Sequence, residues 1–162
     1  VFHDGFSKLI NVRIGFAGVL TGFIVLLGWI PLKQKPFLGT ILNILTIGNV
    51  LDLTMYFIPT PESIIMRHGY LYFGTVLFAM GVGIYIGSGL GPGPRDGIMT
   101  GIAKRGPSVR VTRIAIDFTA FVSGVLLGGS YGYGTIFMVI IVGPIVQFSL
   151  KRYDQGAIFS LK

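Results

Sequence analysis

Five long apolar stretches alternate with short polar links along the chain. A helix needs about 20 apolar residues to cross the hydrocarbon core of a bilayer, and each stretch comes close to that length. The stretches cover residues 14–30, 38–58, 70–88, 111–127 and 135–150. Prolines such as Pro31, Pro59 and Pro107 stand at their edges, where ending a helix costs little. The pattern predicts an all-α, polytopic membrane protein with about five transmembrane helices.

The composition agrees with this prediction. Hydrophobic residues make up 52% of the 162 residues and charged residues 12%, and there is no cysteine. A soluble domain carries about 25% charged residues, so we expect most of this chain to contact the lipid bilayer. The net charge of +7 is interpreted as cations that flank membrane segments, and not as a nucleic-acid surface.

Lysines and arginines in the links predict the orientation, because the side of the membrane that is richer in them is cytoplasmic. If all five stretches cross, one side receives Lys33, Lys35, Arg95, Lys104, Arg105, Arg110, Lys151 and Arg152. The other side receives Lys8, Arg13 and Arg67. We therefore expect an inner (plasma) membrane protein whose C-terminus and 89–110 loop are cytoplasmic. We also expect Arg113 to extend its side chain to the cytoplasmic surface.

The chain contains an internal repeat. HDGFSKL (3–9) aligns with MTGIAKR (99–105), and LGTILNILTIGNVLD (38–52) aligns with YGTIFMVIIVGPIVQ (133–147). Each copy reads as an apolar helix, a Gly/Pro turn, a short helix and two more apolar helices, and the first copy lacks its leading helix and turn. The predicted division is a first repeat at 1–58, a linker at 59–69, a second repeat at 70–153 and a C-terminal tail at 154–162.

Three spanning helices per copy is an odd number, so the second copy is expected to insert upside down relative to the first. Inverted repeats of this kind recur in secondary transporters. The fold expected from the sequence is therefore two inverted three-helix repeats, the first of them incomplete.

Two segments carry a resemblance to a known family. GLGPGPRDGIMTGIAKRGPSVRVTR (89–113) and YGYGTIFMVIIVGPIVQF (131–148) resemble the YczE/YitT-like group of bacterial integral membrane proteins. The first half matches as well, through VFHDGFSKL (1–9) and FLGTILNILTIGNVLDL (37–53). The resemblance implies a polytopic inner-membrane protein with a Gly-x-Gly-Pro-x-Asp turn after a membrane helix in each half; here the first of these turns is missing.

The stretch GLGPGPRDGIMTGIAKRGP (89–107) concentrates the candidate chemistry. It is not a nucleotide loop, because it follows an apolar helix and lacks the Lys-Ser/Thr ending of a phosphate loop. Gly91, Gly93 and Pro94 are expected to shape a turn, and Asp96 to cap a short helix at 97–105. The turn is either an interfacial cap or the wall of a cavity, since non-helical backbone at membrane depth must be covered by protein or water.

Asp117 lies inside the fourth apolar stretch, with Arg113 four residues earlier on the same helix face. A carboxylate within a membrane segment is a candidate functional group; the alternative is a structural ion pair near the headgroups. Asp52 and Gln147 align in the repeat and are either polar lining groups or interface residues. The predicted substrate-binding set is Gly91, Gly93, Pro94, Arg95, Asp96, Arg113 and Asp117.

No nucleophile-and-base set, pair of catalytic carboxylates or metal-binding pattern occurs, so no enzyme activity, cofactor or metal is predicted. The predicted function is that of a small-solute transporter, in which Arg95 or Arg113 attracts an anionic group and Asp117 tunes the charge or carries a proton. The alternative is a non-catalytic structural or accessory subunit of a membrane complex. The expected partners are the lipid bilayer and either other membrane subunits or further copies of the chain, and not nucleic acid.

Overall fold

A computed structural model describes residues 1–58 and 60–153, and this part of the chain is helical with no strand. Its helices are α1 (Phe2–Ile10), α2 (Ile14–Leu27), α3 (Trp29–Leu32), α4 (Leu38–Phe57), α5 (Ile64–Gly87), α6 (Pro94–Ala103), α7 (Val109–Leu126) and α8 (Tyr133–Tyr153). The all-α prediction is confirmed. The predicted tail at 154–162 and position 59 of the predicted linker lie outside the described residues.

Three of the described helices, α4, α5 and α8, are long and apolar enough to cross a membrane. α1 and α2 would together count as a fourth, but they meet at an angle of 103° across a short break. α7 has 18 residues and carries Arg110, Arg113 and Asp117, which lower its hydropathy. Length and composition thus give three or four spans, and the five spans expected from the sequence remain a prediction.

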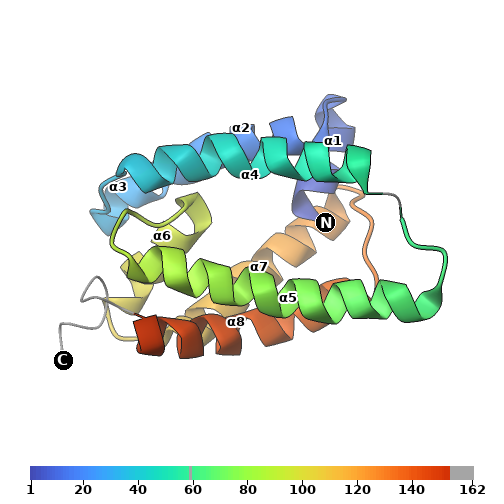
Figure 1. The fold of residues 1–162 in the computed structure, drawn as a ribbon. Helices are drawn as coiled ribbons and strands as arrows, with labels where there is room; N and C mark the ends of the chain where they lie inside the picture. Colours follow the sequence, from blue (N-terminus) through green and yellow to red (C-terminus); the bar gives the residue numbers. More distant parts are fainter. Residues whose placement is uncertain (59, 154–162) are drawn as a thin grey trace.

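The long helices run roughly along one direction, with α2 packed against α4 and α5 packed against α8 (Figure 1). α7 crosses them at a slant and packs against α8. The short helices α1 and α6 both contact α2 and α7, and α6 also contacts α3. The start of α4, the turn after α5 and the end of α8 lie at one end of the long helices (Figure 1).

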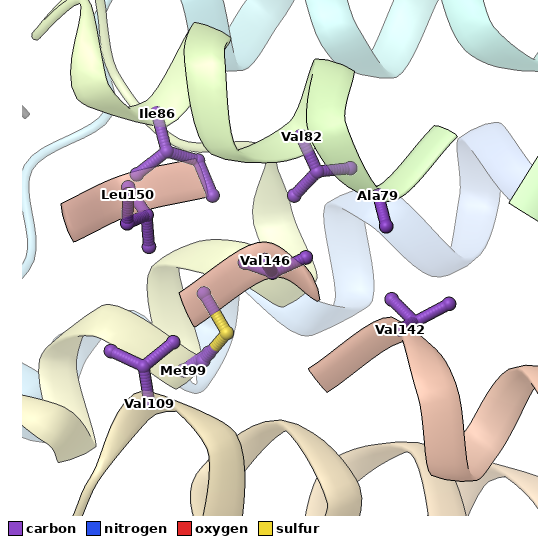
Figure 2. Close-up of a cluster of buried hydrophobic side chains, with 8 residues drawn as sticks. All are labelled: Ala79, Val82, Ile86, Met99, Val109, Val142, Val146 and Leu150. Carbon is purple, nitrogen blue, oxygen red and sulfur yellow. The ribbon is translucent and has the colours of Figure 1, made fainter. Parts of the chain in front are cut away.

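A buried apolar cluster joins α5 to α8, to α6 and to the start of α7. Side chains of α5 face those of α8, with Met99 of α6 and Val109 of α7 beneath them (Figure 2). The cluster contains Ala79, Val82, Ile86, Met99, Val109, Val142, Val146 and Leu150. Gly83 allows the two long helices to approach closely, because a side chain there would overlap Ser149. Ser149 completes the contact by donating to the carbonyl oxygen of Met80 at 3.1 Å.

Large apolar side chains also cover the outside of the described helices. Leu53, Phe73 and Leu77 are 57%, 72% and 61% exposed, and Phe148 is 69% exposed. Single exposed apolar residues are ordinary on soluble proteins, but apolar surface this continuous marks a membrane or a partner. The outer surface therefore agrees with the composition in placing the protein in lipid.

Polar side chains from neighbouring helices cap the starts of α2 and α7. The backbone N–H of Gly15 donates to Asp52 Oδ1 at 3.0 Å, and the backbone N–H of Arg110 donates to Gln147 Oε1 at 2.9 Å. The first N–H groups of a helix have no partner within the helix, so each side chain satisfies a donor at a helix start. Asp52 and Gln147 thus each cap a helix start from a neighbouring helix, and Asp52 also lines a cleft of about 330 Å³ together with Arg13 and Asn49.

Trp29 anchors α3 to α6. Its side chain is 2% exposed, and its indole Nε1–H donates to the carbonyl oxygen of Pro94 at 2.7 Å. The ring lies so close to Gly97 that a methyl group at that position would overlap it. A glycine at 97 is therefore required by the close approach of the indole to the backbone of α6.

We predict that Gly97→Ala destabilises the protein by about 1–3 kcal/mol, since the rigid indole must move out of a packed site. The measurement is the thermal unfolding midpoint in a mild detergent. Gly74→Ala is the matched control, because a Cβ at position 74 of α5 meets no atom within 4 Å. Equal midpoints for the two variants would contradict the proposed Trp29 contact.

Candidate functional site

Backbone and side-chain hydrogen bonds from α4 fix the turn between α5 and α6. Gly91 has a φ of +105°, which a residue with a side chain rarely adopts. The backbone N–H of Gly39 donates to the carbonyl oxygen of Leu90 at 2.9 Å, and Thr40 Oγ1 donates to that of Pro92 at 2.8 Å. α4 satisfies these carbonyl groups, and Gly91, Gly93 and Pro94 are buried, whereas Ser88, Gly89 and Leu90 are exposed. The interfacial cap and the cavity wall therefore both stay predictions.

α6 begins at Pro94, with Gly93 as its N-cap residue. Proline is favoured in the first helical position, because its fixed φ suits the helix and it has no N–H to leave unpaired. The sequence prediction that Asp96 caps a helix at 97–105 is wrong: the helix starts earlier, and Asp96 lies in its first turn. The Asp96 carboxylate is thereby free to point toward α7 and α5.

Arg113 of α7 is the centre of a buried ion network. Its side chain is 1% exposed, and its Nη1 lies 2.5 Å from Asp96 Oδ1. Its Nε donates to Asp117 Oδ2 at 3.0 Å. The expectation that Arg113 reaches the cytoplasmic surface is therefore wrong: two carboxylates hold its guanidinium inside the protein.

Arg95 and Tyr85 extend this network on either side. Arg95 Nη1 lies 3.2 Å from Asp117 Oδ1, and the Arg95 side chain is 44% exposed, so the network opens to the surface at this residue. The hydroxyl of Tyr85 donates to Asp96 Oδ2 and accepts from the backbone N–H of Gly93 at 2.9 Å. Two arginines and two aspartates give the network no net formal charge.

Two buried polar atoms of the network make no hydrogen bond in the described structure, Arg113 Nη2 and Asp117 Oδ1. A buried charged group without its full set of partners costs more than the 1–3 kcal/mol of a neutral one. The positive charge of Arg95, whose Nη1 lies 3.2 Å from Asp117 Oδ1, partly offsets the missing hydrogen bond of that oxygen. The free N–H groups of Arg113 Nη2 are donors suited to an anionic oxygen or a water molecule.

The structure joins four of the seven predicted substrate-binding residues, Arg95, Asp96, Arg113 and Asp117, in one ion network. Gly91, Gly93 and Pro94 are buried in the turn and in the first residue of α6, and Arg95 and Asp96 follow in the first helical turn. Arg113 and Asp117 reach the same place from α7. The pair Arg113–Asp117 was expected from its four-residue spacing; its connection to Asp96 required the packing of α6 on α7.

Tyr85 is the network residue that sequence reasoning missed. It lies near the end of an apolar helix, where a single tyrosine resembles an ordinary interfacial or core residue. Its one sequence signal is its place just before the Gly/Pro turn, at a distance that lets its hydroxyl reach Gly93 and Asp96.

No group of three or more metal-ligating side chains that could hold an ion occurs among the described residues.

The helices, their apolar surface and the buried charges define an integral membrane protein. The model of a family of unknown function, DUF6198, matches residues 1–151, and the chain belongs to this family. It is 36% identical over 152 residues to an uncharacterized protein of Haemophilus influenzae, a match that covers 93% of this chain and 70% of the relative. It is 31% identical over 157 residues to the uncharacterized membrane protein YczE of Bacillus subtilis, covering 95% and 73%. The resemblance found in the sequence is thus confirmed.

The search of solved structures found no significant match.

We predict that Arg113→Met lowers the free energy of unfolding by about 3–5 kcal/mol, because it leaves Asp96 and Asp117 as buried carboxylates without their main cation. The measurement is thermal unfolding in detergent, followed by circular dichroism. Arg110→Met is the control, since the Arg110 side chain is exposed on the same helix. If the two variants unfold at the same temperature, the network contributes nothing to stability.

Proposed function

We propose that the protein is a small-solute transporter of the inner (plasma) membrane, built from two inverted repeats. The observation that carries the proposal is the buried Arg113, whose Nη2 has no hydrogen-bond partner beside the start of a short helix. Charged groups inside membrane proteins are rare and mark substrate or ion pathways. Short helices whose N-termini face the protein interior form anion sites in transporters.

Equivalent elements support the repeat. α1, α2 and α4 occur in the same order as α6, α7 and α8. The N-terminal contacts of α2 and α7, made by Asp52 and Gln147, are also equivalent. α4 and α8 run in opposite directions in the bundle (Figure 1), as an inverted arrangement requires. In this proposal α5 is the leading helix of the second copy.

The proposed site works by exchange of partners around Arg113. An anionic group of the substrate binds the free N–H groups of Arg113 Nη2, and Arg95, which is partly exposed, draws it toward the network. Asp117 pairs with both arginines and so tunes their attraction for the anion. The N-terminal end of α6 adds a favourable dipole for negative charge at this place.

Labelling of single cysteines tests the proposed orientation, because the 162 residues contain no cysteine. Gly132→Cys lies in the loop before α8 and Lys151→Cys at its end, and both positions are exposed. We predict that a membrane-impermeant thiol reagent labels Cys at position 132 in intact cells, and position 151 only after the membrane is opened. The reverse pattern would overturn the orientation.

Flux into liposomes tests the transport proposal. The purified protein is reconstituted and screened with labelled small anions. For a transported solute, we predict that Asp117→Asn and Arg95→Ala each reduce the initial rate by roughly tenfold or more, which corresponds to losing a charge-assisted hydrogen bond of about 1.5–3 kcal/mol. Glu62→Gln and Arg110→Ala change exposed charges outside the network and should leave the rate unchanged.

Two results would contradict the site or the function. Normal rates for both network variants would show that the substrate passes elsewhere. Absence of flux for every solute, together with a membrane protein that co-purifies at fixed stoichiometry, would instead favour an accessory subunit.

A further inference from the structure

A second polar feature of the molecule is a cleft of about 740 Å³ at the end of the bundle that holds the turn after α5. Its walls are the end of α3, the link from α3 to α4, the turn after α5 and the last turn of α6. This volume lies within the range of about 300–1,000 Å³ found for small-molecule sites. The cleft is lined by different residues from those of the ion network.

The cleft is strongly cationic. Lys33 and Lys35 line it from the α3–α4 link, and Lys104 and Arg105 line it from the end of α6. None of its lining residues is acidic, and within residues 1–58 and 60–153 these four cations form no ion pair. Four like charges around one hollow repel one another, so a bound anion would stabilise the arrangement.

One of the four cations, Arg105, is held in place between α3 and α6. Arg105 donates through Nη2 to the carbonyl oxygen of Pro31 and through Nη1 to that of Gly101, both at 3.1 Å. Lys33 ends α3 with a φ of 52°, in the left-handed region where glycine or asparagine is favoured. Because lysine is not favoured in this backbone conformation, its presence indicates that the positive charge has a role here.

The rim of the cleft is apolar. Phe37, which lines the cleft, is 59% exposed, and the neighbouring Leu38 and Leu90 are 68% and 65% exposed. A small soluble anion would make no favourable contact with this apolar surface, whereas the acyl chains of a lipid would cover it. Basic hollows at the ends of membrane helices are known to bind anionic lipid headgroups.

We propose that this cleft binds the phosphate headgroup of an anionic phospholipid, with the acyl chains lying over Phe37, Leu38 and Leu90. The lysines and Arg105 bind the phosphate oxygens, and Gln34, Ser88 and Thr100 supply further polar groups in the lining. The cleft shares Gly91 with the predicted transport site but none of the charged residues of the ion network, so the lipid proposal stands whether or not the protein carries a solute.

Native mass spectrometry of the full chain in mild detergent tests the site. Phosphatidylglycerol and phosphatidylcholine both carry a phosphate, but only the first has a net charge, so the ratio of their retention isolates the contribution of charge. We expect the wild type to retain phosphatidylglycerol preferentially. The preference should fall roughly fivefold for each lysine removed, the equivalent of about 1 kcal/mol per cation. The test variant is the double change Lys33→Asn and Lys35→Gln, in which asparagine suits the left-handed backbone at position 33.

The matched control is the double change Lys151→Gln and Arg152→Gln, which removes the same charge from exposed positions outside the cleft lining. Equal loss of preference in the control and the cleft variant would overturn the site, as would equal retention of the two lipids by the wild type. Inorganic phosphate is the second arm. If phosphate alone at millimolar concentration abolishes the lipid preference, the cleft binds a free anion and the lipid assignment is wrong.

Discussion

Burying a guanidinium among apolar helices costs several kcal/mol unless carboxylates surround it. Arg113 meets this constraint with Asp96 on one side and Asp117 on the other. Asp117 lies on the same helix, but Asp96 lies on α6, so the pairing requires α6 to pack on α7 in one orientation. That orientation places the start of α6 and the turn before it inside the bundle, with Tyr85 bonded to both.

The turn before α6 obeys a second constraint, which is that buried polar backbone groups need hydrogen-bond partners. The start of α4 supplies two of them, through the backbone N–H of Gly39 and the hydroxyl of Thr40. Trp29 supplies a third by donating to the carbonyl oxygen of Pro94. Segments of the first half of the chain thus support a turn of the second half. The two halves therefore depend on each other for stability.

Much of the order of the helices could be predicted from the sequence, because the hydropathy of consecutive residues indicates where a membrane helix lies. α4 and α8 agree with the apolar stretches at 38–58 and 135–150. α5 begins at Ile64, earlier than the apolar stretch at 70–88, because the helix continues through Arg67 and His68, which hydropathy assigns to a polar link. Backbone hydrogen bonding within a helix does not require apolar side chains, so α5 extends beyond the apolar stretch.

The sequence alone determined that the chain lies in a membrane, that it is helical and that it belongs with the YczE/YitT-like proteins, because these properties follow from residues close together in the chain. It also indicated the pair Arg113–Asp117, which one helical turn brings together. Only the tertiary structure decided that Arg113 points inward to Asp96, and that Lys33 shares a cleft with Lys104. Each of these contacts joins separate helices, and the direction in which a helix face points is set by the helices that pack against it.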